Sequence, residues 1–205
     1  MGVLVQTFVP YADFARTAAV LDTKRLGKQR VEVIQIVRAL TVPGYAWSSH
    51  PAVLMWKGHE EALGRYGLAM CEEWRRRGFG DTCAETIVAD LARAGVDRLR
   101  SYPELVEAGA LPAWLFEESV QGSHRSALVR KDPEHYVSAF PDADPEVPYV
   151  WPVRSEAVLE RERRREEAAE RRAVREQEAR ALSGRRRPSS RRDVPASRAR
   201  PRGSP

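Results

Sequence analysis

The sequence predicts an all-α fold, and three observations lead to this class. Apolar residues recur at helical spacing from residue 18 to residue 40, where one face of a helix would hold Leu26, Val33, Val37 and Leu40. A second stretch with the same period runs from about residue 51 to residue 77. No strand-like alternation is convincing after residue 9. We therefore expect a compact single domain of about four to six helices with irregular connections.

Proline, glycine and charge mark where these elements begin and end. Residues 3–9 are expected to be extended up to Pro10, and a turn or short helix with Asp13 as a possible cap leads into the helix of residues 18–40. Pro51 marks the beginning of the second helix, and the bases before Gly78 mark its end. The remaining expected elements are a weaker helix over 81–94, a short helix within 101–112, a helix over 113–131, one turn after Pro133, and an irregular aromatic and proline-rich segment over 140–152.

Charge divides the chain into a body and a tail. Residues 154–205 contain 17 Arg against 9 acidic residues, a net charge of +8. Because the whole chain has a net charge of +5, residues 1–153 have a net charge of about −3. We expect a helical domain over residues 1–152 and an Arg-rich tail over residues 153–205. The tail would form a solvated helix over 155–182 and a disordered segment after it. Its basic charge favours a polyanionic partner, whereas the basicity of the whole chain says nothing about a site in the body.

Several classes of chemistry lack support in the sequence. Cys71 and Cys83 form no CxxC pair, and the four histidines have no metal-ligand spacing, so no metal and no other cofactor are expected. Nucleotide-binding glycine motifs and the nucleophile elbow of serine hydrolases do not occur. There is no basic leader followed by an apolar run and no apolar stretch of membrane-spanning length. The expected protein is cytoplasmic, monomeric and without a membrane partner.

Glu32 is the candidate catalytic group on the first long helix. It lies just off the apolar face, and its neighbours one turn away are mostly cationic or amide side chains: Arg25, Lys28, Gln29 and Gln35. A partly buried acid among bases can be held ionised and still reach a ligand. The alternative is an ordinary solvated helix face with local ion pairs.

Several short motifs occur together and in a fixed order. They are Leu21-Asp22-x-Lys24-x-Leu26 followed by Glu32, His50-Pro51, Arg77-Gly78-Phe79, and His124-x3-Leu128-x-Arg130-Lys131-Asp132-Pro133-Glu134-x-Tyr136. In this order and spacing, over roughly residues 5–152, they resemble the pyrimidine-dimer DNA glycosylase family, whose founding members are phage enzymes. The resemblance implies a compact helical fold, double-stranded DNA as the partner, and DNA repair by a glycosylase with associated AP-lyase activity.

The resemblance also implies roles for individual residues. In the family a free N-terminal amine is the nucleophile and a glutamate on the first long helix is the essential acid; here these would be Gly2, if Met1 is removed, and Glu32. The bases Arg25, Lys28 and Arg30 would hold phosphates. The other expected DNA contacts are His50, His124, Arg125 and Lys131, although His50 could instead cap a helix and His124 could be a packing residue.

Two departures from the family pattern leave other functions open. The residues after Met1 are Gly2 and three apolar residues, where the family has a small hydroxyl residue and an arginine, and Val31 replaces an arginine beside the glutamate. One hypothesis is that the natural first residue is Val5. The alternatives to a pyrimidine-dimer glycosylase are a non-catalytic nucleic-acid-binding module on the same fold and a glycosylase for another modified base.

Overall fold

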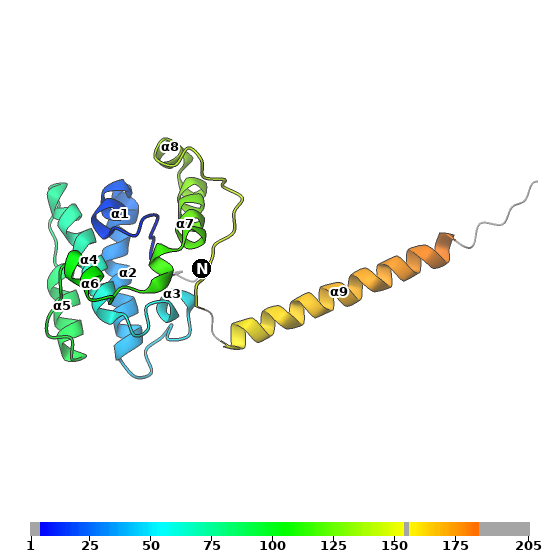
Figure 1. Cartoon of the computed structure of the whole chain (residues 1–205), viewed down its shortest axis with the longest axis horizontal. Helices are drawn as coiled ribbons and strands as arrows, with labels where there is room; N and C mark the ends of the chain where they lie inside the picture. The colour runs from blue at the N-terminus through cyan, green and yellow to red at the C-terminus, as the bar shows by residue number, and fades with distance from the viewer. Residues whose placement is uncertain (1–4, 154–155, 185–205) are drawn as a thin grey trace, which may run out of the picture. The chain divides into compact units, whose positions relative to one another are not determined.

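The chain folds into helices joined by irregular segments (Figure 1). The structure is a computed structural model that describes residues 5–153 and 156–184. The all-α class is confirmed, because these residues contain helices and no strand. In chain order the elements are α1 (Phe14–Val20), α2 (Thr23–Thr41), α3 (Pro51–Leu54), α4 (Glu60–Arg76), α5 (Cys83–Arg93), α6 (Tyr102–Glu107), the 3-10 helix η1 (Ala113–Phe116), α7 (Glu118–Lys131), α8 (Pro133–Tyr136) and α9 (Glu156–Gly184).

The helix expected over residues 18–40 is two helices, α1 and α2. Asp22 is the N-cap of α2: its backbone is extended and its carboxylate accepts a hydrogen bond from the Arg25 amide at 3.1 Å. A capping residue leaves the helical conformation in order to satisfy such an amide, so the chain turns here. The prediction of one continuous helix over residues 18–40 was therefore wrong, because α1 ends at Val20 and α2 begins at Thr23. Asp13 caps α1 in the same way, as expected.

Two other expected helices are also broken. Gly58 adopts a φ of 80°, a left-handed conformation that ends the helical path between α3 and α4. Glu117 is extended between η1 and α7. The apolar period continues across both breaks, which explains why the sequence pattern predicted longer and fewer helices than the structure contains.

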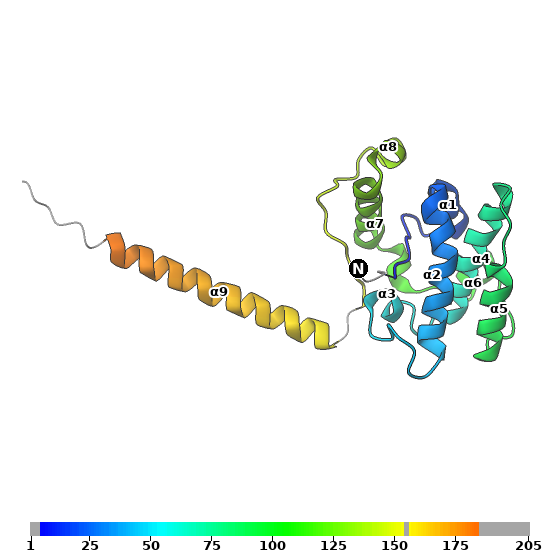
Figure 2. The same cartoon turned by 180° about the vertical axis from the view of Figure 1, so that it is seen from behind.

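Helices α2, α4 and α5 pack against one another, and α1 packs against α4 (Figures 1 and 2). Gly67 permits the close approach within this group. A Cβ atom at this position would lie 2.7 Å from Cγ1 of Val33 on α2 and 2.8 Å from Cδ1 of Ile87 on α5. The glycines that weaken α4 as an isolated helix thus allow it to pack in the core.

The segment of residues 5–9, before α1, crosses the interior of the body between α2 and α7 (Figure 1). The amide of Phe8 donates to Oε1 of Gln29 on α2 at 2.8 Å, and the amide of Val9 donates to Nδ1 of His124 on α7 at 2.8 Å. Side chains supply the partners that another strand would otherwise give. This extended segment is therefore held by two helices without being part of a sheet.

Residues 141–153 form the irregular connection expected before the tail. The Tyr149 hydroxyl lies 3.2 Å from the Thr7 carbonyl oxygen and donates to it, so this connection packs on the N-terminal segment. The chain divides into two units, Met1–Val158 and Leu159–Pro205. Whether residues 1–152 fold as an independent domain stays a prediction.

Helix α9 matches the solvated helix expected in the tail. The side chains described between residues 163 and 177 are all exposed, and ion pairs such as Arg164 with Glu160 and Arg172 with Glu176 link successive turns. The disordered segment expected after it lies outside the described residues. In the part of the chain that the structure covers, no helix is both long and apolar enough to cross a membrane.

Candidate active site

Glu32 opens onto a pocket of about 280 Å³. Three parts of the chain form its walls: the segment of residues 5–9, helix α2 and the end of α7. The lining residues are Gln6, Phe8, Lys24, Arg25, Lys28, Gln29, Glu32 and Lys131. Of the expected site residues, the structure brings together Glu32, Arg25, Lys28 and Lys131.

The Glu32 side chain is almost entirely buried, with 2% of its surface exposed. Burial raises its pKa to about 7, because removing a carboxylate from water disfavours the charged form. The Lys28 ammonium, 3.2 Å from Oε1 of Glu32, acts in the opposite direction and offsets only part of this effect. Burial thus opposes the ionised form of Glu32, which the nearby bases favour. A carboxyl with such a pKa can both give and accept a proton near neutral pH.

Gln29 links Glu32 to the N-terminal segment. Its amide nitrogen donates to Oε2 of Glu32 and, at 2.9 Å, to the carbonyl oxygen of Gln6. Its amide oxygen accepts from the Phe8 amide and from the Tyr66 hydroxyl, at 2.8 and 2.7 Å. Gln29 thereby holds its four partners in one network, which fixes the orientation of the Glu32 carboxyl beside the N-terminal segment.

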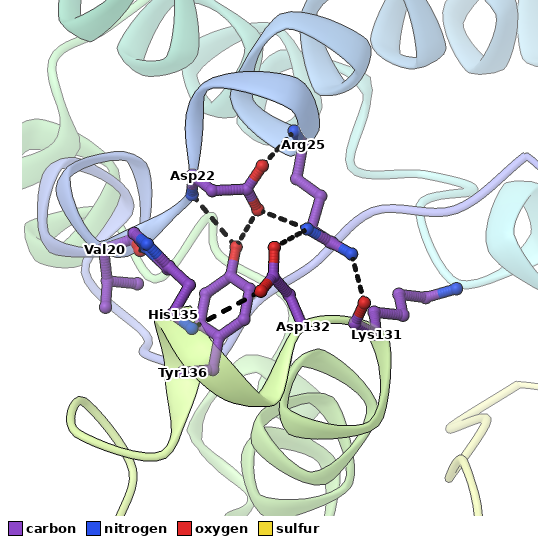
Figure 3. A network of polar contacts seen from close by, with 7 residues as sticks. All are labelled: Val20, Asp22, Arg25, Lys131, Asp132, His135 and Tyr136. Atoms are coloured by element: carbon purple, nitrogen blue, oxygen red, sulfur yellow. Dashed lines mark hydrogen bonds and ion pairs between the residues drawn. The ribbon is translucent and has the colours of Figure 1, made fainter.

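A second network holds the end of α7 against the beginning of α2 (Figure 3). Nη1 of Arg25 donates to the carboxylates of Asp22 and Asp132 at 2.7 and 3.1 Å, and Nη2 donates to the Lys131 carbonyl oxygen at 2.8 Å. The Tyr136 hydroxyl donates to Asp22 at 2.5 Å. Arg25 was expected to hold a phosphate, but its guanidinium is already engaged in these contacts, and its position favours orienting Lys131.

Arg30 does not face the pocket, although the sequence placed it among the phosphate-binding bases. It pairs with the carboxylate of Asp81, and its guanidinium lies over the Trp74 ring at 4.0 Å from the ring centre. The Arg30 and Asp81 side chains are 11% and 1% exposed. A guanidinium that is stacked and paired in this way has a structural role.

His124, which was expected to contact DNA, lies inside the body. Its side chain is fully buried, it accepts the Val9 amide hydrogen bond, and burial lowers its pKa to about 3, so the ring is neutral. The packing role that the sequence left open is the one observed. Arg125 does not line the Glu32 pocket. It donates to the Pro10 carbonyl oxygen at 2.9 Å and pairs with Glu118.

His50 is the N-cap of α3, the other role that the sequence left open. Its Nδ1 accepts from the Ala52 amide at 3.2 Å, and its ring packs edge-on against Trp47 and Trp151. Burial lowers its pKa and so favours the neutral ring. His50 does not line the Glu32 pocket.

Gly2 lies outside the described residues, so its expected role as the nucleophile stays a prediction. The sequence did not single out Gln6, Phe8 or Gln29 as site residues. A signal for Gln29 was present, because this amide lies three residues before Glu32 on the same side of the helix. The contribution of residues 6 and 8 could not be foreseen, since it depends on a segment far from α7 in sequence crossing the core. Among the residues described, no cluster of three or more metal-ligating side chains occurs.

Residues 5–86 match the model of a known protein family, described as pyrimidine dimer DNA glycosylase. This match confirms the family resemblance inferred from the motifs, and the matched part includes Glu32 and most of the pocket wall. Comparisons with curated proteins and with solved structures gave no significant match.

Proposed function

Residues 5–86 match the pyrimidine dimer DNA glycosylase family, and on this premise we propose that the chain is a DNA-repair glycosylase with AP-lyase activity on double-stranded DNA. The reaction would take place in the Glu32 pocket. Glu32 would act as acid and base, and the N-terminal amine, at Gly2 if Met1 is removed, would act as the nucleophile.

One observation above all supports this proposal: an almost fully buried carboxyl with a pKa of about 7 faces a pocket lined by lysines. Burying an ionisable carboxyl in this way lowers the stability of the fold. A residue with a purely structural role would not need such a group. An acid titrating near neutral pH suits a reaction that needs a proton donor in one step and an acceptor in the next.

The residues around the pocket suit attack by an amine on deoxyribose. The neutral amine adds to C1′ and the bond to the base breaks, the base leaving with the electron pair and taking up the proton that the amine nitrogen loses. Protonated Glu32 gives its proton to O4′ as the sugar ring opens, and an imine forms between the amine nitrogen and C1′. Ionised Glu32 then removes a C2′ proton, the C3′–O3′ bond breaks, and water hydrolyses the imine.

The position of the N-terminal segment also supports this arrangement. Gln6 lines the pocket, and Gln29 hydrogen-bonds to both Gln6 and Glu32. Gly2 precedes Gln6 by four residues, which span at most about 14 Å even when fully extended. An α-amine also has a pKa near 8, so a useful fraction is neutral at physiological pH.

The test uses the whole chain, the Glu32→Gln variant and two duplex oligonucleotides, one with a cyclobutane pyrimidine dimer and one with an abasic site. We expect the wild-type protein to break a glycosidic bond at the dimer, cut the lesion-bearing strand of each duplex, and form a borohydride-trapped adduct. Glu32→Gln should lower the cleavage rate by at least about 100-fold, as loss of a general acid–base group does. Glu107→Gln, at an exposed position at the end of α6, is the matched control and should cleave normally.

Each other outcome points to a different function. Trapping on abasic DNA without cleavage at dimers would favour a glycosylase for another modified base. DNA binding with neither an adduct nor cleavage would favour a non-catalytic binding module. Full activity of Glu32→Gln would show that the reaction does not depend on this carboxyl.

A further inference from the structure

The lysines of this chain are concentrated in the Glu32 pocket. The sequence contains 30 arginines and only four lysines, of which Lys24, Lys28 and Lys131 line the pocket. Both residue types supply positive charge, but arginine stays protonated in proteins, whereas a lysine amine can lose its proton and act as a nucleophile. A chain that uses arginine almost everywhere else could hold phosphates with arginine here as well. The composition of the pocket thus indicates a requirement for amines.

The three pocket lysines differ in their surroundings. The Lys28 ammonium is already engaged in an ion pair with Glu32, at 3.2 Å. Lys24 is exposed in the first turn of α2. Lys131 approaches from the other side of the pocket, at the end of α7, and forms no ion pair within the described part of the chain.

The charges that face Lys131 favour its neutral form. Partial burial lowers its pKa, and the cations Arg25, Lys28 and Arg130 lower it further. Glu32 acts in the opposite direction and only partly offsets these effects. Lys131 is thus more easily deprotonated than an ordinary surface lysine.

The Lys131 backbone is also held in place. Its carbonyl oxygen accepts the hydrogen bond from Arg25, and the next residue, Asp132, pairs with the same guanidinium. In Figure 3 the Lys131 side chain extends away from this network. The network therefore fixes the base of the side chain while the amine stays accessible to the pocket.

We propose that Lys131 is a second catalytic amine, an inference that rests on the proposed function. It forms an imine with abasic-site DNA and supports strand cleavage when the N-terminal amine is blocked. The neutral Nζ adds to the C1′ aldehyde of the opened sugar, and the C1′ oxygen leaves as water after taking a proton from Glu32. Ionised Glu32 then removes a C2′ proton, the C3′–O3′ bond breaks with its electrons going to the phosphate oxygen, and water hydrolyses the imine to free Lys131.

The test uses borohydride trapping on a duplex with one abasic site, with the full chain acetylated at its α-amine alone. The proteins are wild type, Lys131→Arg and Lys57→Arg. Lys57 is exposed between α3 and α4 and provides the matched control, because the same charge-preserving change is made at the only lysine outside the pocket. Thermal unfolding of each variant confirms that it is folded.

We expect the acetylated wild-type protein and acetylated Lys57→Arg to form the adduct. Acetylated Lys131→Arg should form at least about tenfold less of it, because arginine cannot supply a neutral amine. Digestion and mass spectrometry should place the reduced adduct on Lys131. An adduct that disappears on acetylation, that is unaffected by Lys131→Arg in the acetylated protein, or that maps to Lys24 or Lys28 would overturn the assignment and leave the proposed function standing. No adduct with either the free or the acetylated protein would overturn the proposed function as well.

Discussion

Burial and Lys28 act on the Glu32 carboxyl in opposite directions, and burial has the larger effect. Lys28 is 55% exposed, so water screens its attraction for a carboxylate that is itself nearly inaccessible. The result is an acid whose pKa in the folded protein, about 7, is well above the ordinary value of 4.5. The folded state therefore holds this proton over a pH range in which the unfolded chain has already released it.

This difference predicts how stability depends on pH. As pH rises from about 4.5 to about 7, the unfolded chain loses the Glu32 proton first, so the free energy of unfolding should fall. The shift corresponds to about 3 kcal/mol, which Glu32→Gln should remove. Urea unfolding of both proteins at pH 4.5 and pH 8 measures this effect. Parallel pH profiles for the two proteins would show that Glu32 is not the group responsible.

At the residue scale, position along a helix could be predicted, whereas the partners of each side chain could not. The helical period correctly placed Glu32 beside Arg25 and Lys28, since these residues lie on one helix. Arg30 and His124 have equally suitable charge or chemistry, but their partners, Asp81 and Val9, lie 51 and 115 residues away. Periodicity within one helix contains no information about such contacts.

At the element scale, the glycines of α4 show how packing overrides helix propensity. Gly67 lies where Val33 and Ile87 leave no room for a methyl group. Val33 is β-branched and buried, so it cannot move aside by changing rotamer as a long side chain could. The contact between α2 and α4 thus fixes the depth at which α2, and Glu32 with it, lies in the body.

We expect Gly67→Ala to lower the free energy of unfolding by about 1–3 kcal/mol, as overpacking of a core does. Gly122→Ala on α7 is the matched control. There the nearest atoms to an added Cβ are 3.5 and 3.7 Å away, so the change should leave stability equal or higher by about 0.5–1 kcal/mol. Denaturant unfolding measures both. Equal effects at the two positions would contradict the packing explanation.

The breaks between elements were the part of the fold least open to prediction. The apolar period runs across Gly58 and Glu117, and nothing local requires a helix to end at a glutamate. Breaks with a strong local cause were more accessible: Pro51 and Asp13 begin helices as expected. Asp22 has the same capping chemistry as Asp13, but the apolar residues before it favoured a continuous helix.

At the scale of the whole molecule, the excess of positive charge and the candidate catalytic group are in different parts of the sequence. Glu32 lies in the part of the chain with a net charge of about −3, whereas residues 154–205 hold +8. Long-range attraction to a polyanion would come mainly from the tail, and recognition of the lesion from the pocket.

Deleting residues 155–205 should leave the melting temperature of the body nearly unchanged, because the described side chains of α9 beyond residue 163 are exposed. The same deletion should weaken DNA binding and reduce its salt dependence, since fewer counterions are released. Thermal unfolding and DNA titrations at several salt concentrations test both parts. A large fall in melting temperature would indicate that the tail packs on the domain.

The buried N-terminal segment also has a consequence for synthesis of the chain. Val9 is hydrogen-bonded to a residue 115 positions later, and Thr7 to one 142 positions later. A ribosome makes residues 5–9 first, yet their partners emerge only when most of the body has been translated. The pocket beside Glu32 can therefore be completed only late in translation. Until then residues 5–9, three of which are apolar, belong to an unfolded or partly folded chain.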